Sequence, residues 1–147
     1  NMNAVFYASR AVFKKMKEQK SGRIINVSSV HGIRASEFKS AYVTAKHGVI
    51  GLTKVLALEG AGFNVTCNAI CPGYVKTPLV EGQIKDQAKT HQMSEDEVVE
   101  KVMLKKQAVK SFVPVEKLGE IAVFLSAENA TTVSGSVFTL DGGWSAQ

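Results

Sequence analysis

Residues 23–48, RIINVSSVHGIRASEFKSAYVTAKHG, join a short β-branched run to a segment with helical spacing. The run Ile24, Ile25 and Val27 is typical of a strand, and Ser21-Gly22 before it predicts a turn that ends a preceding helix. Residues 40–59 carry apolar side chains at helical intervals, and they end at a pair of glycines, which predicts an amphipathic helix. A strand followed by a helix is the unit from which parallel sheets are built.

The same alternation continues on both sides of this unit. Residues 1–17 have the apolar spacing of a helix, FNVTCNAICPG at 63–73 is typical of a strand, and another helix is expected after Pro114. A third strand is expected in GSVFTLDGG at 135–143. The sequence therefore predicts an α/β fold, part of a doubly wound, Rossmann-type parallel sheet of about three strands with flanking helices.

Composition narrows the class of protein. The 147 residues are 45% hydrophobic and 21% charged, as in ordinary globular proteins. The net charge of +5 could suggest nucleic-acid binding, but the lysines are spread along the chain without interleaved aromatic or arginine clusters. No apolar run approaches the length of a membrane span, and no signal peptide is visible. We therefore expect a cytoplasmic protein with no nucleic-acid or membrane partner.

Cys67 and Cys71 lie in the strand expected at 63–73. Two cysteines without a matching His or Cys set do not make a zinc site, so no metal is predicted. Reduced and mostly buried thiols are the expected state of both side chains.

Tyr42 and Lys46 are four residues apart, so they lie on the same face of the helix expected at 40–59. A free phenol has a pKa of ~10, and a nearby ammonium group favours its ionised form. Tyr42 could then act as a general acid or base, and Ser29, at the end of the preceding strand, could donate a hydrogen bond to the same substrate oxygen. The alternative is a packed tyrosine beside an unrelated lysine, because this spacing alone is a weak motif.

The combination of NVSS, YVTAK and NAICPGYVKTP resembles the short-chain dehydrogenase/reductase family over essentially the whole chain. The resemblance implies that Ser29, Tyr42 and Lys46 are the catalytic set and that Asn1 is its fourth member, positioning a water in a proton relay. It also implies that Lys46 holds the ribose hydroxyls of a nicotinamide cofactor, NAD. The cofactor-binding set implied by the resemblance consists of Tyr42, Lys46, Pro72, Gly73, Val75 and Thr77.

One part of the family pattern is absent from these residues. The family's glycine-rich phosphate loop precedes everything seen here, and EGAGFN at 59–64 follows a helix instead of a strand. We therefore expect residues 1–147 to be the C-terminal portion of one dinucleotide-binding domain. The family's determinants of NAD or NADP preference lie in the part of the pattern that precedes these residues. Within residues 1–147, the polar and lysine-rich residues 78–112 are expected to form a substrate lid.

The substrate is predicted from four side chains around Tyr42. His31, Lys39 and Gln83 together suit a small carboxylate. Longer runs, such as the ending LDGGWSAQ, resemble the bacterial branch of the family that oxidises (R)-3-hydroxybutyrate to acetoacetate. By this resemblance the first three residues bind the carboxylate and Trp144 bounds the methyl group. Taken singly, each of the four could equally be a packing or surface residue.

Two alternatives to this function stay open. The first is another member of the same family, such as a 3-oxoacyl reductase or a sugar or steroid dehydrogenase; the basic residues Lys39 and His31 argue against bulky neutral substrates. The second is a non-catalytic fragment that serves as an oligomerisation module. The resemblance further implies a homotetramer for the intact enzyme, in which the helices of residues 1–17 and 40–59 pack across subunits.

Overall fold

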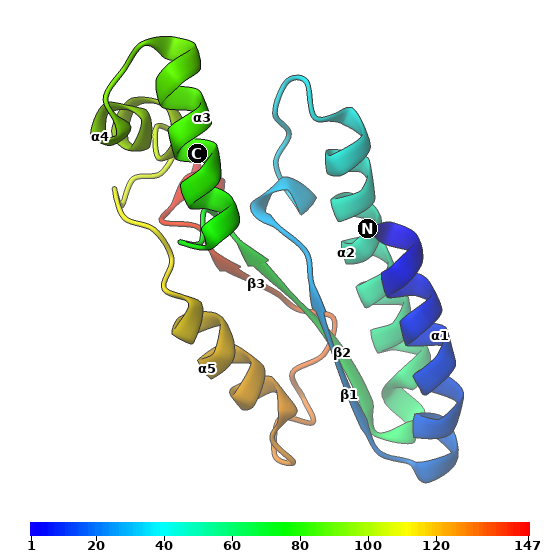
Figure 1. The fold of residues 1–147 in the computed structure, drawn as a ribbon. Helices are drawn as coiled ribbons and strands as arrows, with labels where there is room; N and C mark the ends of the chain where they lie inside the picture. Colours follow the sequence, from blue (N-terminus) through cyan, green and yellow to red (C-terminus); the bar gives the residue numbers. More distant parts are fainter.

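A three-stranded parallel sheet lies between two layers of helices in the computed structural model, which describes residues 1–147 (Figure 1). The strands are β1 (Gly22–Val27), β2 (Val65–Pro72) and β3 (Val137–Leu140), and β2 lies in the middle. All neighbouring strands are parallel. The predicted α/β fold and its three strands are therefore confirmed.

The central strand β2 is buried along its whole length, as expected for a parallel strand that is covered on both faces. It pairs with β1 from Gly22↔Val65 to Val27↔Ile70. It pairs with β3 from Ala69↔Val137 to Pro72↔Leu140. This register brings the carboxyl ends of the strands to the same end of the sheet, where ligands bind in folds of this type.

Helices α1 (Met2–Gln19) and α2 (Ser40–Gly60) cover one face of the sheet, and α5 (Val115–Ser126) covers the other (Figure 1). The core between α2 and the sheet forms two clusters of buried residues. The first cluster consists of Ile24, Leu56, Ala57, Val65 and Cys67, and the second of Ile50, Ala69 and Cys71. Of the predicted apolar face of residues 40–59, Leu56 lies in the first cluster and Leu52 packs against it, whereas Val55 is 49% exposed.

Both cysteines are free and buried in β2, in agreement with the sequence prediction. Burial raises the pKa of Cys67 to about 11 and also raises the pKa of Cys71. Both side chains are therefore neutral thiols at pH 7. No group of three or more His, Cys, Asp or Glu side chains is arranged to hold a metal ion.

Helix α1 extends slightly further than the predicted helix of residues 1–17. It ends at Gln19, and Lys20, which adopts the left-handed conformation at φ 52°, closes it just before Ser21-Gly22. Gly22 instead begins β1. Only Ser9 of α1 is buried, and Phe6 stays 42% exposed, so the apolar face of this helix is only partly covered.

Residues 78–112 are more regular than the weakly helical segment that the sequence indicated. They contain α3 (Pro78–His91), α4 (Glu95–Val98) and a π-helical turn, η3 (Val99–Met103). Ile84, Val98 and Met103 form a separate small core in this segment, beyond the carboxyl ends of the strands (Figure 1). Helix α3 packs on α4 and makes no comparable contact with the sheet.

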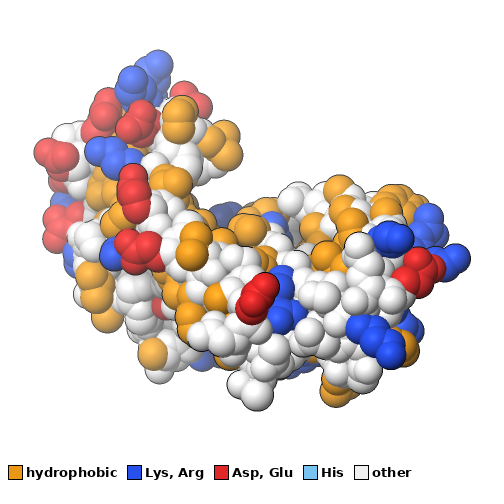
Figure 2. All heavy atoms as spheres, turned by 90° about the horizontal axis from the view of Figure 1, so that it is seen from below, with side chains coloured by type: hydrophobic (Ala, Val, Ile, Leu, Met, Phe, Trp, Pro, Cys, Tyr) orange, Lys and Arg blue, Asp and Glu red, His pale blue; other side chains and the backbone are white.

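The charged side chains are distributed over the surface. Figure 2 shows basic side chains at the right-hand end of the molecule and acidic ones mostly on its left-hand part. None of the helices combines the length and the apolar character that crossing a bilayer requires.

Candidate functional site

The ends of β1 and β2 form the floor of the candidate site. Ser28 and Ser29 follow β1 directly, and the backbone N–H of Ser28 donates to the carbonyl of Ile70 at 2.8 Å, which extends the ladder by one bond. The one-turn helix η1 (Val30–Gly32) then leads the chain away from the sheet. Gly73 follows β2, and its N–H donates to Leu140 at 2.9 Å.

A pocket of about 490 Å³ opens at this end of the sheet. Nine of the residues predicted from the sequence line it: Ser29, His31, Lys39, Tyr42, Gly73, Val75, Thr77, Gln83 and Trp144. They come from the end of β1, the start of α2, the end of β2, the start of α3 and the C-terminus. No Asp or Glu is among the residues that line the pocket.

Lys46 lies directly behind Tyr42 on α2. Its Nζ is 5.6 Å from the centre of the Tyr42 ring and donates to the carbonyl of Val27 at 3.2 Å. The backbone carbonyl of Lys46 accepts a hydrogen bond of 2.9 Å from Ser28 Oγ. Burial lowers the pKa of Lys46. The predicted Tyr–Lys pair is therefore held together at the end of β1, and the Tyr42 side chain remains 39% exposed at the pocket.

Ser29 is buried, and its hydroxyl faces the same pocket. Its Oγ accepts a hydrogen bond of 3.2 Å from the backbone N–H of His31. Because this bond uses a lone pair, the hydroxyl hydrogen stays available for a ligand.

His31 is buried between two aromatic rings. Its ring centre is 5.8 Å from that of Tyr42 and 5.2 Å from that of Trp144, both in edge-on geometry. Its Nε2 lies 3.1 Å from Ser36 Oγ. Burial, followed by the nearby charges of Lys39, Lys106 and His47, lowers the pKa of His31 to about 4. The imidazole is therefore neutral at pH 7 and carries a single N–H.

The far wall of the pocket is aromatic. Trp144 is buried in the short helix η4 (Trp144–Ala146), and Tyr74 stacks on it at 6.2 Å between ring centres. Burial raises the pKa of Tyr74. Lys39 and Gln83 line the pocket from more exposed positions. Tyr74 was not among the predicted site residues, although an aromatic directly after Pro72-Gly73 was a signal that could have indicated it.

Three predicted residues do not line this pocket. Lys46 lies behind Tyr42, and Pro72 is the buried last residue of β2. Asn1 is exposed at the start of α1, where the neighbouring Met2 packs near Gly48 of α2. The structure adds Val30, Leu79 and Val80 to the lining. These apolar residues carried no signal in the sequence that distinguished them from core residues.

The segment between β2 and α3 contributes Gly73, Tyr74, Val75 and Thr77 to the pocket lining. Thr77 precedes α3, and its Oγ1 accepts from the backbone N–H of Val80 at 3.4 Å. The N-terminus of α3 has the positive end of the helix dipole, which favours a negatively charged group, but Pro78 has no N–H and the N–H groups of Val80 and Glu81 already donate to Thr77. A Cβ at Gly73 would lie 3.0 Å from Gln107 Oε1 and 3.1 Å from Asp141 Cα, so a side chain there would require these neighbours to shift.

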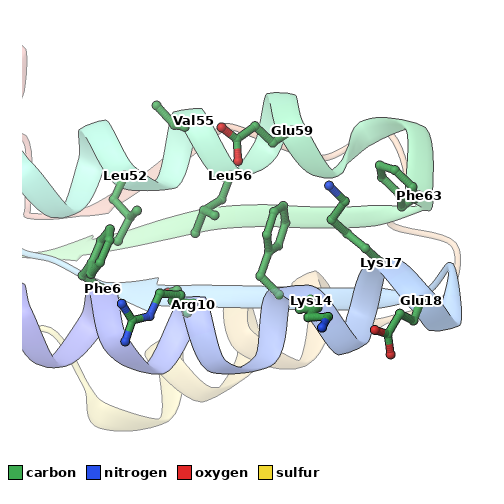
Figure 3. A pocket seen from close by; sticks show the side chains of 12 residues that line it. Phe6, Arg10, Lys14, Lys17, Glu18, Leu52, Val55, Leu56, Glu59 and Phe63 are labelled. Carbon is green, nitrogen blue, oxygen red and sulfur yellow. The ribbon is translucent and has the colours of Figure 1, made fainter.

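A second and larger pocket, of about 720 Å³, lies between α1 and α2 (Figure 3). Figure 3 shows Phe6 beside Leu52 at one end of it and Lys17 beside Phe63 at the other. The ammonium of Lys17 is 4.4 Å from the centre of the Phe63 ring. This pocket contains none of the predicted site residues, so we take the smaller one at the strand ends as the candidate site.

Comparisons with known proteins identify the family to which the chain is similar. The family model described as enoyl-(acyl carrier protein) reductase matches residues 1–145. The chain is 50% identical over 147 residues to a D-beta-hydroxybutyrate dehydrogenase of Rhizobium meliloti, and 48% identical to one of Cupriavidus necator. Each match covers 100% of this chain and 57% of the relative.

The fold has a close counterpart among solved structures. An actinorhodin polyketide ketoreductase with NADPH superimposes with a TM-score of 0.90 at 29% identity, over 100% of this chain and 57% of that one. The chain thus spans a little over half the length of the proteins that it matches.

Proposed function

This chain belongs to the short-chain dehydrogenase/reductase family, and on that premise we propose that the protein carrying it interconverts (R)-3-hydroxybutyrate and acetoacetate with NAD. The observation that carries the proposal is the composition of the pocket. Tyr42 and Ser29 share it with Lys39, His31 and Gln83, and no acidic side chain lines it. Such a lining favours a substrate that combines a reactive hydroxyl with a carboxylate.

The proposed chemistry assigns proton transfer to Tyr42. Its phenolic oxygen takes the hydroxyl proton of the substrate during oxidation and returns it during reduction. The Ser29 hydroxyl donates to the substrate oxygen, and the Lys46 ammonium lies 5.6 Å from the centre of the Tyr42 ring. A bound nicotinamide supplies the hydride acceptor. Because Lys46 donates to Val27, its ammonium is oriented before substrate arrives.

The proposed carboxylate site consists of three residues of the pocket lining, Lys39, His31 and Gln83. Lys39 supplies charge, and neutral His31 and Gln83 supply hydrogen-bond donors. The stacked rings of Trp144 and Tyr74 form an apolar wall that suits the methyl group. We assign cofactor contacts to Pro72, Gly73, Val75 and Thr77, and Asn1 to the proton relay. For the cofactor itself we propose NAD, in a cytoplasmic enzyme.

The intact enzyme is proposed to be a homotetramer in which α1 and α2 pack against the same helices of a second subunit. The groove in Figure 3 fits this role, because its lining includes the apolar side chains of Phe6 and Val55, which are 42% and 49% exposed in the single chain. A two-fold interface is self-complementary, so one amphipathic face serves both partners.

Substrate specificity tests the proposed function. In a full-length protein that carries this chain, Lys39→Ala should raise the KM for (R)-3-hydroxybutyrate about tenfold to a hundredfold, the effect of losing a charge-assisted hydrogen bond of roughly 1.5–3 kcal/mol. The KM for a neutral secondary alcohol should change much less.

Acetoacetyl-CoA provides the control for the 3-oxoacyl reductase alternative. The wild-type protein should reduce acetoacetate faster than acetoacetyl-CoA, because the thioester lacks the carboxylate next to the ketone. Equal effects of Lys39→Ala on both classes of substrate, or a preference for the thioester, would reject the proposed function.

A further inference from the structure

Lys106 lies outside the pocket lining, yet it lies close to the lining residue Trp144 and to Ser36, which is in contact with the lining residue His31. Its Nζ donates to Ser36 Oγ at 3.4 Å and lies 5.5 Å from the centre of the Trp144 ring. The Ser36 oxygen is in turn 3.1 Å from His31 Nε2. A cation that the family motifs do not include therefore contacts the wall residue directly and the imidazole through one hydroxyl.

The backbone around Lys106 is fixed by the C-terminal turn. The N–H groups of Ala108 and Val109 both donate to Gly142, at 2.8 and 2.9 Å, and the Gln147 side chain donates to the carbonyl of Lys106. Gln107 beside it is fully buried and donates to Val109 and Ser111. The position of Lys106 over Trp144 thus follows from the fold, although the side chain is exposed.

The contact between Lys106 and Ser36 has a direct consequence for His31. An ammonium group can only donate, so it occupies a lone pair of the Ser36 oxygen and makes the hydroxyl a stronger donor and a weaker acceptor. A Ser36 hydroxyl that donates to His31 Nε2, 3.1 Å away, leaves the single proton of the neutral imidazole on Nδ1. Nδ1 makes no hydrogen bond in the structure and is the nitrogen that remains for a ligand.

We propose that Lys106 is a positioning residue for substrate binding: through Ser36 it fixes the proton of His31 on Nδ1, and it holds the indole of Trp144 against the pocket. The inference rests on the proposed function, because a carboxylate accepts hydrogen bonds only and needs the N–H of a neutral imidazole to face it. The effect of Lys106 is thus on binding, and proton transfer at Tyr42 does not depend on it.

The imidazole nitrogen spectrum tests this role without substrate. ¹⁵N NMR of the full-length, ligand-free protein should show His31 protonated on Nδ1. Lys106→Met should move part of that population to Nε2, and Lys106→Arg should restore the wild-type spectrum. Lys105→Met is the matched control, since it removes the same charge from the neighbouring residue, whose side chain contacts neither Ser36 nor Trp144.

Kinetics supply the second readout. Lys106→Met should raise the KM for 3-hydroxybutyrate about two- to fivefold, the size expected for an exposed charged contact, and leave kcat nearly unchanged. Protonation of wild-type His31 on Nε2, or an unchanged His31 spectrum in Lys106→Met, would overturn the inference. Absence of turnover with 3-hydroxybutyrate would reject the proposed function, whereas the spectrum would still decide what Lys106 does to His31.

Discussion

His31 is neutral near pH 7 because it is buried between Tyr42 and Trp144 and lies near the lysine charges of Lys39 and Lys106. Its pKa falls from 6.5 in the unfolded chain to about 4 in the folded protein. Between these values the unfolded state binds more protons, so the free energy of unfolding decreases as the pH falls through this window.

The decrease of the free energy of unfolding at lower pH can be measured by denaturation. On acidification from about pH 7 to about pH 5, the urea midpoint of the full-length protein should fall further in the wild type than in His31→Gln, which cannot take up that proton. Other titrating groups affect both proteins alike, so the difference reports His31. An identical decrease in both would show that the histidine titrates in the folded state much as it does in the unfolded one.

Single residues were predictable from the sequence where local spacing alone brings side chains together. Tyr42 and Lys46 are neighbours because any helix places them so, and Ser29 joins them because it ends a strand. Lys106 was not predictable, since its contact with Ser36 crosses 70 positions of the sequence. Lys106 reaches Ser36 because residues 108 and 109 are bound to the turn of the chain at Gly142.

At the scale of elements, the junction from β1 to α2 depends on Gly32. A Cβ at this position would lie 2.6 Å from Ser28 Oγ, 2.7 Å from Ile50 Cδ1 and 2.9 Å from the carbonyl of Lys46. Two of these atoms belong to the hydrogen bond that joins Ser28 to Lys46. The close approach of η1 to α2 therefore needs a glycine here, at the point where Ser29, the proposed catalytic serine, and the Tyr–Lys pair meet.

Gly32→Ala should consequently destabilise the protein by about 1–3 kcal/mol, as expected for overpacking, and should also lower activity by displacing Lys46. Chemical denaturation of the full-length protein measures the first effect. Gly51→Ala is the control, because a Cβ there meets nothing within 4 Å and alanine favours a helix by up to about 1 kcal/mol. Equal stability of the two variants would contradict this account of the junction.

The element from α3 to η3 is predicted to move as a lid. It has its own core around Ile84, Val98 and Met103, and α3 packs on α4 with little contact to the sheet. Hydrogen exchange in the full-length protein should show faster amides over residues 78–112 than in β2, and they should slow when NAD and a substrate analogue bind. Slow exchange without ligand would mean that the segment is a fixed part of the surface.

The sequence predicted the existence and order of the elements better than their ends. The alternation of β-branched runs with helical spacing indicated the parallel sheet, whose central strand is a continuous buried run. Helix α1 runs to Gln19 where residues 1–17 were predicted, and it is closed at Lys20, a residue with no turn signal that takes the left-handed conformation glycine usually takes. The π-helical turn η3 follows from packing on Ile84 and Phe112, which no local pattern encodes.

At the scale of the whole molecule, β1 is an edge strand with an exposed end. Val27 is 52% exposed, and the relatives extend over almost twice the length of this chain. An open edge favours pairing with another chain. Contacts to the nicotinamide end alone do not easily offset the entropy lost when a whole dinucleotide is immobilised.

Residues 1–147 by themselves are therefore predicted to bind NAD poorly and to show no dehydrogenase activity. Calorimetric titration of the isolated chain with NAD should give little heat, whereas a full-length protein that carries it should bind. Micromolar binding by the isolated chain, together with 3-hydroxybutyrate-dependent reduction of NAD, would contradict this prediction. It would show that contacts to the nicotinamide end alone are enough for cofactor binding and catalysis.

Turnover of (R)-3-hydroxybutyrate with NAD by the full-length wild type and by Tyr42→Phe tests the proposed chemistry most directly. We expect NADH formation by the wild type and a fall in kcat of about a hundredfold or more in the variant, because phenylalanine keeps the ring beside Lys46 and His31 but cannot exchange a proton. Retained NAD binding by Tyr42→Phe serves as the control for folding. Near-normal turnover by the variant would contradict the role of Tyr42 and, with it, the account of this site.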